Sequence, residues 1–326
     1  MKQRTGRFSS KNKMLNKKAF QFGWIFSVIV GAFIFFLAFY FISSLMSTQR
    51  MQRETVEART LDILLSNFMP LKKAEPLKVS FEKVNLVIKC DSNSVLGFNT
   101  IKVKTRKGSE GIERKVYDKY IFAEIRENEK VKEVQTFTVP FYMPWYVADL
   151  TFLWPKERTY CFVNAPFEIE EELGNETSTG LGLVTFSDQV NECPGNSVVV
   201  CFSSSNNCNI KVIMGGSFVE KNGKDLPYIN KETLYAAIFS DPELYFCNLK
   251  RLAKRISLQT EIYKEKITTL TNCETVNDET LDSLDEAASQ LALCNTPTCF
   301  GRELKNLKEK ATALNDENRY ARCQIF

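Results

Sequence analysis

The sequence predicts an α+β protein: an N-terminal transmembrane helix, a β-rich extracytoplasmic domain and a C-terminal set of helices, stabilised by disulfides. Three observations support this prediction. Residues 20–42 form an apolar run without a charged side chain. Apolar residues alternate with a period of two between residues 79 and 214, and helical spacing returns over roughly the last ninety residues.

The apolar run from Phe20 to Ile42 is long enough to cross a bilayer. At a rise of about 1.5 Å per residue, a helix needs about 20 apolar residues to span a hydrocarbon core of about 30 Å. The only strongly polar side chain in this run is Gln21. A buried helix of a soluble protein is the alternative, although such helices usually keep a polar face. We therefore expect a transmembrane helix over residues 19–43.

The charges beside this run predict its orientation. The segment before it carries seven basic and no acidic residues, whereas both signs are mixed after it. The positive-inside rule makes residues 1–18 a cytoplasmic basic tail and places residues 44–326 outside. A cleaved signal peptide is the alternative, but the run exceeds the usual apolar region of about 7–15 residues and lacks an Ala-x-Ala-like exit. We expect an uncleaved anchor in the cell membrane.

The charge balance limits the classes of partner. Seven of the 43 Lys and Arg residues lie in the tail, which leaves 36 of them against 39 acidic residues outside. A nucleic-acid binder would need a basic excess there, so we expect no nucleic acid. The expected partners are the lipid bilayer and an envelope protein or further copies of the chain.

All ten cysteines follow the apolar run, at Cys90, Cys161, Cys193, Cys201, Cys208, Cys247, Cys273, Cys294, Cys299 and Cys323. An even number of cysteines in an oxidising compartment predicts disulfides. A zinc site is the alternative, but the chain has no histidine, and even the closest pair lacks the two-residue spacing of zinc sites. The connectivity stays open, although the cysteines of residues 193–208 form one local group and those from Cys247 onward a second.

Residues 44–68 continue the helical spacing, so the helix is expected to reach Phe68, before Pro70 and Pro76 stop it. Residues 77–230 are then expected to form one β-rich domain, a sandwich or an α+β sheet of about eight strands. The expected strands lie in SFEKVNLVIKC, NTIKVKT, KYIFAEI, VQTFTV, DLTFLW, YCFV, LVTFS, SVVVCF and NIKVIM. Asn222-Gly223 predicts a tight turn, and Asn175 begins a candidate glycosylation sequon.

Residues 231–326 are expected to form a helical hairpin or three-helix bundle. Asp241-Pro242, Asp278 and Thr296-Pro297 have the capping and first-turn residues that begin helices. Apolar residues at three- and four-residue steps follow each start, as in helices that pack on one another.

No catalytic motif stands out, and we expect neither an enzyme nor a cofactor. Without histidine, Ser-His-Asp and Cys-His catalysis are excluded, and no Gly-rich phosphate loop is present. Carboxylates cluster at Glu168, Glu170, Glu171 and Glu172, which is compatible with calcium or a general acid, but a solvated loop edge is the simpler interpretation. A carboxylate-dependent envelope hydrolase is a further, weaker alternative.

The segment from Val139 to Tyr146 is the candidate binding patch. Two prolines interrupt its strand pattern among five large side chains, Phe141, Tyr142, Met143, Trp145 and Tyr146. Such side chains anchor interfaces when exposed and cores when buried. The expected function is therefore that of a membrane-anchored structural or interaction protein that acts through protein contacts in the cell envelope.

Three stretches, FQFGWIFSVIVGAFIFFLAFYF, TFTVPFYMPWYVADLTFLW and LYAAIFSDPELYFCNLKRLAKRISLQTEIYKEK, together resemble uncharacterised single-pass membrane proteins of small-genome archaea. The resemblance covers most of the chain. It implies a membrane location and no particular activity.

The N-terminal part also resembles type IV pilin-like proteins, which join a short basic leader to a long hydrophobic helix and a β domain. Lys17-Lys18-Ala19 before Phe20 is similar to the site that archaeal prepilin peptidases cut. This resemblance implies a subunit that is processed before Phe20 and assembled through its N-terminal helix. Two features depart from that plan: Trp24 stands where bacterial pilins carry a glutamate, and the C-terminal helices have no counterpart.

Overall fold

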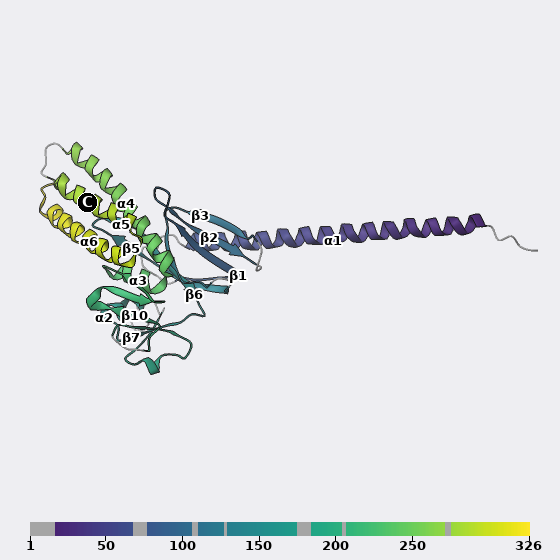
Figure 1. Ribbon diagram of the computed structural model, residues 1–326, viewed down its shortest axis with the longest axis horizontal. Coiled ribbons are helices and arrows are strands. Elements are labelled where there is room, and N and C mark those ends of the chain that lie inside the picture. Colours follow the sequence, from purple (N-terminus) through teal and green to yellow (C-terminus); the bar gives the residue numbers. More distant parts are fainter. Residues whose placement is uncertain are drawn as a thin grey trace, which may run out of the picture. The chain divides into compact units, whose positions relative to one another are not determined.

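The structure, a computed structural model, describes residues 17–67, 77–105, 110–126, 129–174, 184–203, 207–270 and 275–326. Within these ranges the chain is a mixed α+β protein with two six-stranded sheets (Figure 1). It divides into two compact units, Met1–Arg53 and Glu54–Phe326. The sequon at Asn175 and the cysteine Cys273 lie outside the described residues.

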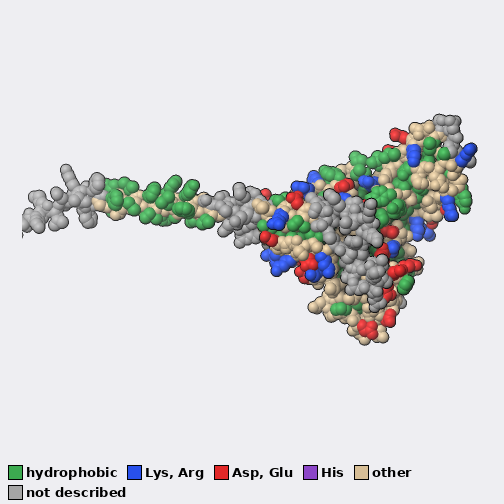
Figure 2. Space-filling view, turned by 180° about the vertical axis from the view of Figure 1, so that it is seen from behind, with side chains coloured by type: hydrophobic (Ala, Val, Ile, Leu, Met, Phe, Trp, Pro, Cys, Tyr) green, Lys and Arg blue, Asp and Glu red, His purple; other side chains and the backbone are tan. Residues whose placement is uncertain are grey.

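Helix α1 (Lys17–Asn67) begins the described chain. Its stretch Gly23–Ser43, of 21 residues, is apolar and has no buried residue, and Figure 2 shows hydrophobic side chains along the visible face of this stretch. At about 1.5 Å per residue it is about 31 Å long, close to the thickness of a bilayer's hydrocarbon core. Among the described residues, it is the one helical stretch long and apolar enough to cross a membrane.

The end of α1 belongs to the second unit. Leu61 and Leu64 are buried in an apolar cluster with residues of the first sheet. Glu57 is also buried, and its carboxylate accepts hydrogen bonds from the backbone N–H and the hydroxyl of Thr105, at 2.7 and 2.9 Å. The described part of α1 reaches Asn67, and the expected end at Phe68 lies outside the described residues.

The first sheet has the strand order β3-β2-β1-β5-β6-β4. All neighbouring strands in it are antiparallel except β4 and β6, which are parallel. In β1, Val84, Leu86 and Ile88 lie on one face, as their alternation predicts. The strands are β1 (Leu77–Asp91), β2 (Phe98–Lys104), β3 (Ile112–Val116), β4 (Tyr120–Ala123), β5 (Lys130–Tyr142) and β6 (Tyr146–Pro155).

The second sheet has the order β12-β11-β10-β9-β7-β8, in which β8, β7, β9 and β10 are parallel. Its strands are β7 (Tyr160–Val163), β8 (Thr185–Ser187), β9 (Val198–Cys201), β10 (Ile210–Ile213), β11 (Phe218–Lys221) and β12 (Lys224–Pro227). Asn222 and Gly223 join β11 to β12 with φ values of 53° and 70°. Two positive φ values suit the Asn-Gly hairpin turn that the sequence predicts.

The helices of the second unit are α2 (Phe167–Leu173), α3 (Lys231–Phe239), α4 (Pro242–Thr269), α5 (Asp278–Leu293) and α6 (Pro297–Tyr320). Two short 3₁₀ turns, Val190–Glu192 and Met214–Gly216, join strands. Helices α4, α5 and α6 lie side by side in Figure 1, and the apolar stripes of all three enter one core. The expected starts of α4, α5 and α6 are confirmed at Pro242, Asp278 and Pro297.

The boundary expected near residue 230 does not separate two cores. Phe239 of α3 stacks on Trp154 of β6, with ring centroids 4.5 Å apart, and also contacts Tyr160 of β7 at 4.9 Å. Helix α3 is buried from Thr233 to Phe239 because it packs against strands of both sheets. A helix that is apolar on all sides is stable only in such a position.

The sequence interpretation missed three strands and misassigned one segment. Strands β3, β11 and β12 are only four or five residues long, and charged side chains interrupt their alternation. The acidic run at residues 168–172 is helix α2 rather than a loop edge, because Ile169 and Leu173, four residues apart, bury one side of a helical turn.

Arg251 joins α4 to the first sheet. Its guanidinium donates hydrogen bonds to the carbonyls of Leu96 at 3.2 Å and Tyr117 at 2.9 Å, and to the side chains of Asn99 and Asn248. Arg251 has no exposed surface, so these acceptors replace the water that its charge loses on folding.

Candidate functional site

The candidate binding patch lies at the turn between β5 and β6 and divides between core and surface. Phe141, Met143 and Trp145 are buried, whereas Tyr142 is 58% and Tyr146 is 45% exposed. The five side chains therefore do not form one exposed surface, as a binding patch would require. The reason is strand alternation, which turns every second residue of this turn toward the core.

Trp145 is the centre of an aromatic group that includes α4. Its indole N–H donates a hydrogen bond to the side-chain carbonyl of Gln259, at 3.0 Å. Its ring lies 4.3 Å from that of Tyr263 and 5.3 Å from that of Phe326. A tryptophan with a satisfied N–H and aromatic neighbours is an anchor of the core.

Two exposed tyrosines lie at this turn, and a hydrogen bond ties the turn to α4, which carries exposed apolar residues of its own. The rings of Tyr142 and Tyr146 meet edge to face at 5.8 Å. Gln259 donates a hydrogen bond to the backbone carbonyl of Tyr146 at 3.3 Å, which brings the α4 segment that carries Leu258 and Ile262 to this turn. Leu258 and Ile262, four residues apart on α4, are exposed as well. We call these four residues, Tyr142, Tyr146, Leu258 and Ile262, the tyrosine surface. Burial and the nearby Asp149 raise the pKa of Tyr146 to about 12, so its hydroxyl keeps its proton at neutral pH.

The described cysteines form four disulfides, Cys90–Cys247, Cys161–Cys193, Cys201–Cys208 and Cys294–Cys299. Cys323 is disulfide-bonded too. The prediction of a disulfide-stabilised fold is thus confirmed. Two disulfides, Cys201–Cys208 and Cys294–Cys299, lie within the expected local groups. The other two do not: Cys193 pairs with Cys161, outside its group, and Cys90–Cys247 spans 157 residues and ties β1 to α4.

The acidic run does not form a metal site. Glu172 accepts a hydrogen bond from the hydroxyl of Tyr235 at 2.7 Å and pairs with Lys231 at 2.8 Å, so its carboxylate joins α2 to α3. Glu168 and Glu170 lie on the exposed side of α2. Over the described part of the chain, no three His, Cys, Asp or Glu side chains are placed to hold a metal ion together.

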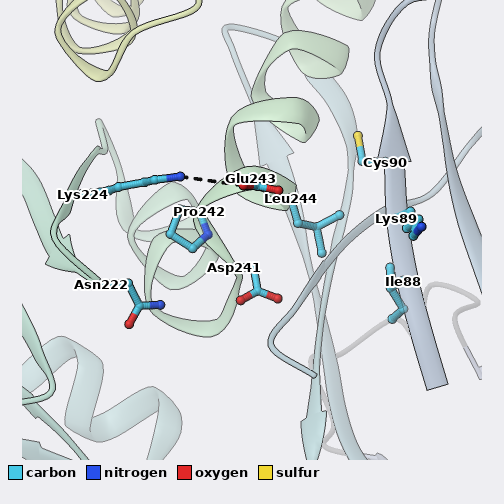
Figure 3. A pocket seen from close by; sticks show the side chains of 9 residues that line it. All are labelled: Ile88, Lys89, Cys90, Asn222, Lys224, Asp241, Pro242, Glu243 and Leu244. Atoms are coloured by element: carbon cyan, nitrogen blue, oxygen red, sulfur yellow. Dashed lines mark ion pairs between the residues drawn. The ribbon is translucent and has the colours of Figure 1, made fainter. Parts of the chain in front are cut away.

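A cavity of about 570 Å³ opens at the start of α4, between that helix, strand β1 and the β11–β12 hairpin (Figure 3). Lys224 of the hairpin reaches across it to Glu243, with 3.9 Å between nitrogen and oxygen. Asp241 lies at the N-cap position of α4 but does not cap it with its side chain. On the opposite wall, Cys90 is held in its disulfide and offers no thiol.

A buried cluster of charges lies between β11 and the start of α4. Lys221 is 2% exposed, and its ammonium donates hydrogen bonds to Glu124 at 2.6 Å and to the carbonyls of Ile238 at 2.6 Å and Ser240 at 2.9 Å. Arg158 lies 3.7 Å from the other oxygen of Glu124. The single carboxylate of Glu124 thus serves two buried cations.

Electrostatics in this cluster favours a structural role. Burial lowers the pKa of Lys221, although the charge of Glu124 opposes that effect. Burial also raises the pKa of Asp241, and the charge of Glu124 adds to the increase. All three N–H bonds of the Lys221 ammonium have acceptors, so this amine is a tie between β11 and the α3–α4 turn rather than a free nucleophile.

Sequence reasoning had no signal for this cluster. Along the chain, Lys221 lies 97 residues from Glu124, and Arg158 lies 34 residues from Glu124. Each stands at the end of a short strand or in a turn, where a charged residue is usually solvated.

Comparison with known proteins found no matching family model, no matching curated protein and no matching solved structure.

Proposed function

We propose that this chain is a single-pass membrane protein that holds its disulfide-bonded unit outside the cytoplasm and acts there through contacts with other envelope proteins. The observation that supports this most is the pairing of two features. A helical stretch of 21 residues is apolar and exposed, and four disulfides join pairs of described cysteines in the unit that follows it. An apolar helix needs lipid around it, and disulfides persist in oxidising compartments.

The charges give the orientation in this proposal. Seven basic and no acidic residues precede the apolar stretch, which keeps the N-terminus in the cytoplasm. The cysteines then all lie on the opposite side.

The tyrosine surface supports a function through protein contacts. It combines two tyrosines with two aliphatic residues, and the exposed fraction of each of these four side chains lies between 39% and 58%. Tyrosines and aliphatic side chains that gather on a surface are typical of protein interfaces. Trp145 beneath them gives this surface a rigid base.

The location is tested on protein extracted from its own membrane without reductant. Thiol alkylation, intact mass and N-terminal sequencing are measured together. The proposal expects the N-terminal residues to be retained and the described cysteines to resist alkylation. A mature chain that begins after the apolar stretch, or free thiols throughout, would rule out an anchored, oxidised unit.

The contact surface is tested by site-specific photo-crosslinking in intact membranes. A photoreactive phenylalanine derivative replaces Tyr142 in one variant and Tyr320, an exposed tyrosine at the end of α6, in the control. The proposal expects a discrete crosslinked product from position 142 and none from position 320. Equal products from both positions would mean that the tyrosine surface is not a specific interface.

A second candidate is a pilin-like subunit. One observation favours it: α1 continues beyond its apolar stretch, and Leu61 and Leu64 near its end are buried together with residues of the first sheet. A helix whose first part is apolar and exposed, and whose last part packs against a sheet, suits assembly of many copies through their N-terminal helices. The same N-terminal sequencing tests it, because processing before Phe20 would remove the basic tail and leave the apolar helix in place.

A further inference from the structure

One face of the first sheet is rich in lysine. Residues directly opposite each other on neighbouring strands share a face. Asn85 of β1 lies opposite Lys104 on one side and Lys130 on the other. Thr100 of β2 lies in the same way between Lys89 and Lys115. These pairings place lysines of four strands on one face of the sheet, around Asn85, which is itself buried.

Two more lysines complete the set. Lys102 lies two residues before Lys104 on β2, and Lys132 lies two residues after Lys130 on β5, so both share that face. We call the six residues Lys89, Lys102, Lys104, Lys115, Lys130 and Lys132 the lysine face.

The lysine face carries a clear excess of positive charge. The acidic residues that share it are Glu113, which pairs with Lys102 at 3.0 Å, and Asp91, which lies opposite Phe98. Its six lysines therefore exceed its two carboxylates, whereas acidic residues outnumber basic ones over the chain beyond the N-terminal tail. The hydrogen bond from Lys102 and then the charges of Lys102, Lys115 and Lys89 lower the pKa of Glu113, as expected for a carboxylate among several lysines. Such a local reversal of charge is complementary to an anionic partner.

Aromatic rings lie at one end of this face. The ammonium of Lys115 lies 4.5 Å from the ring centre of Phe98. That ring in turn lies 5.4 Å from Tyr117, which is 57% exposed. Exposed rings next to cations can contact the apolar faces of sugar rings while the lysines contact their acidic groups.

We propose that the lysine face binds an anionic polysaccharide. Lysines on this face are separated by about 7 Å along a strand and about 10 Å across two strands. That grid suits a polymer with a regularly repeated carboxylate or sulfate, and a flexible polymer can follow the twist of the sheet, whereas a flat bilayer cannot. The expectation that such a polymer meets this face outside the cytoplasm rests on the proposed function, while the binding itself does not.

The test uses the full chain in nanodiscs of a zwitterionic lipid. Binding to immobilised polygalacturonate, with neutral dextran as reference, is measured at low and high salt. In the test variant Lys104, Lys130 and Lys132 are replaced by Gln; none of these three forms an ion pair in the described structure. In the control variant, Lys305, Lys308 and Lys310 of α6 are replaced by Gln, which removes the same charge from another element.

The proposal expects binding to polygalacturonate that salt weakens, an affinity at least about tenfold lower for the test variant, and little change for the control. Unchanged melting temperatures establish that both variants are folded. Equal losses in the two variants, equal binding to dextran, or no binding by the wild-type chain at low salt would overturn it. Capture by vesicles of anionic lipid without capture by the polymer would overturn it as well and would assign the face to a membrane surface. None of these results bears on alkylation or the N-terminal sequence, so the proposed location fails or stands separately.

Discussion

Replacement of Trp145 separates a core role for the aromatic segment from an interface role. Trp145 is 4% exposed, donates its N–H to Gln259 and packs against the rings of Tyr263 and Phe326. In Trp145→Ala these contacts disappear together and a cavity takes their place. Trp145→Phe keeps most of the ring packing but loses the hydrogen bond.

The expected magnitudes differ enough to be resolved. Removal of a buried tryptophan side chain lowers the free energy of unfolding by about 3–5 kcal/mol. The loss of one hydrogen bond alone costs about 1 kcal/mol, so Trp145→Phe is expected to fall between this value and that of the alanine variant. For a unit of this size, each kcal/mol lowers the melting temperature by about 2–4 °C, which gives roughly 6–20 °C for Trp145→Ala.

The assay is thermal unfolding of the full chain in detergent without reductant, followed by near-ultraviolet circular dichroism. The matched variant is Tyr142→Ala, because Tyr142 lies three residues away on the exposed side of the same turn. It is expected to change stability by no more than about 0.5 kcal/mol. If Trp145→Ala melts within about 2 °C of the wild type, the packing argument is refuted, and the tryptophan belongs to an interface.

Three further predictions follow from the buried charges and the longest disulfide. In Arg251→Leu, the carbonyls that Arg251 binds lose their hydrogen-bond donor. The free energy of unfolding, measured in urea, is therefore expected to fall by about 3–5 kcal/mol, and a variant as stable as wild type would contradict this. The double variant Cys90→Ser/Cys247→Ser opens a loop of 157 residues, so the unfolded chain gains conformational freedom. The free energy of unfolding in the same assay is expected to fall by about 5 kcal/mol, and a fall of less than about 1 kcal/mol would contradict this reason. Because burial raises the pKa of Asp241, the folded chain holds that proton more tightly than the unfolded one, and the resulting stability is lost as pH rises through the folded pKa. Asp241→Asn is therefore expected to gain stability relative to wild type as pH rises from about 4 to 7, and a constant difference over that range would disprove the assignment.

The sequence predicted the elements whose side chains follow a long regular period. The apolar stretch at residues 23–43, strand β1 and helices α4 to α6 all repeat their pattern over many residues, so local chemistry alone specifies them. The Asn222-Gly223 turn was equally predictable, because positive φ values at two successive residues strongly limit the choice of amino acid.

The sequence could not predict the features that depend on distant partners. The number of cysteines and their position after the apolar stretch predict disulfides, but pairing Cys90 with Cys247 requires β1 and α4 to meet. The buried position of Trp145 likewise depends on Gln259 of α4, 114 residues further along the chain.

By itself, then, the sequence determined an apolar helical stretch long enough to cross a membrane, the cysteines that follow it and the order of most strands and helices, because each depends on neighbours a few residues away. Only the tertiary structure decided that α3 lies against both sheets, that Lys221 shares Glu124 with Arg158, and that lysines of four strands form one face. Those arrangements are set by the registers of the strands and the packing of elements far apart in the chain, which no local pattern records.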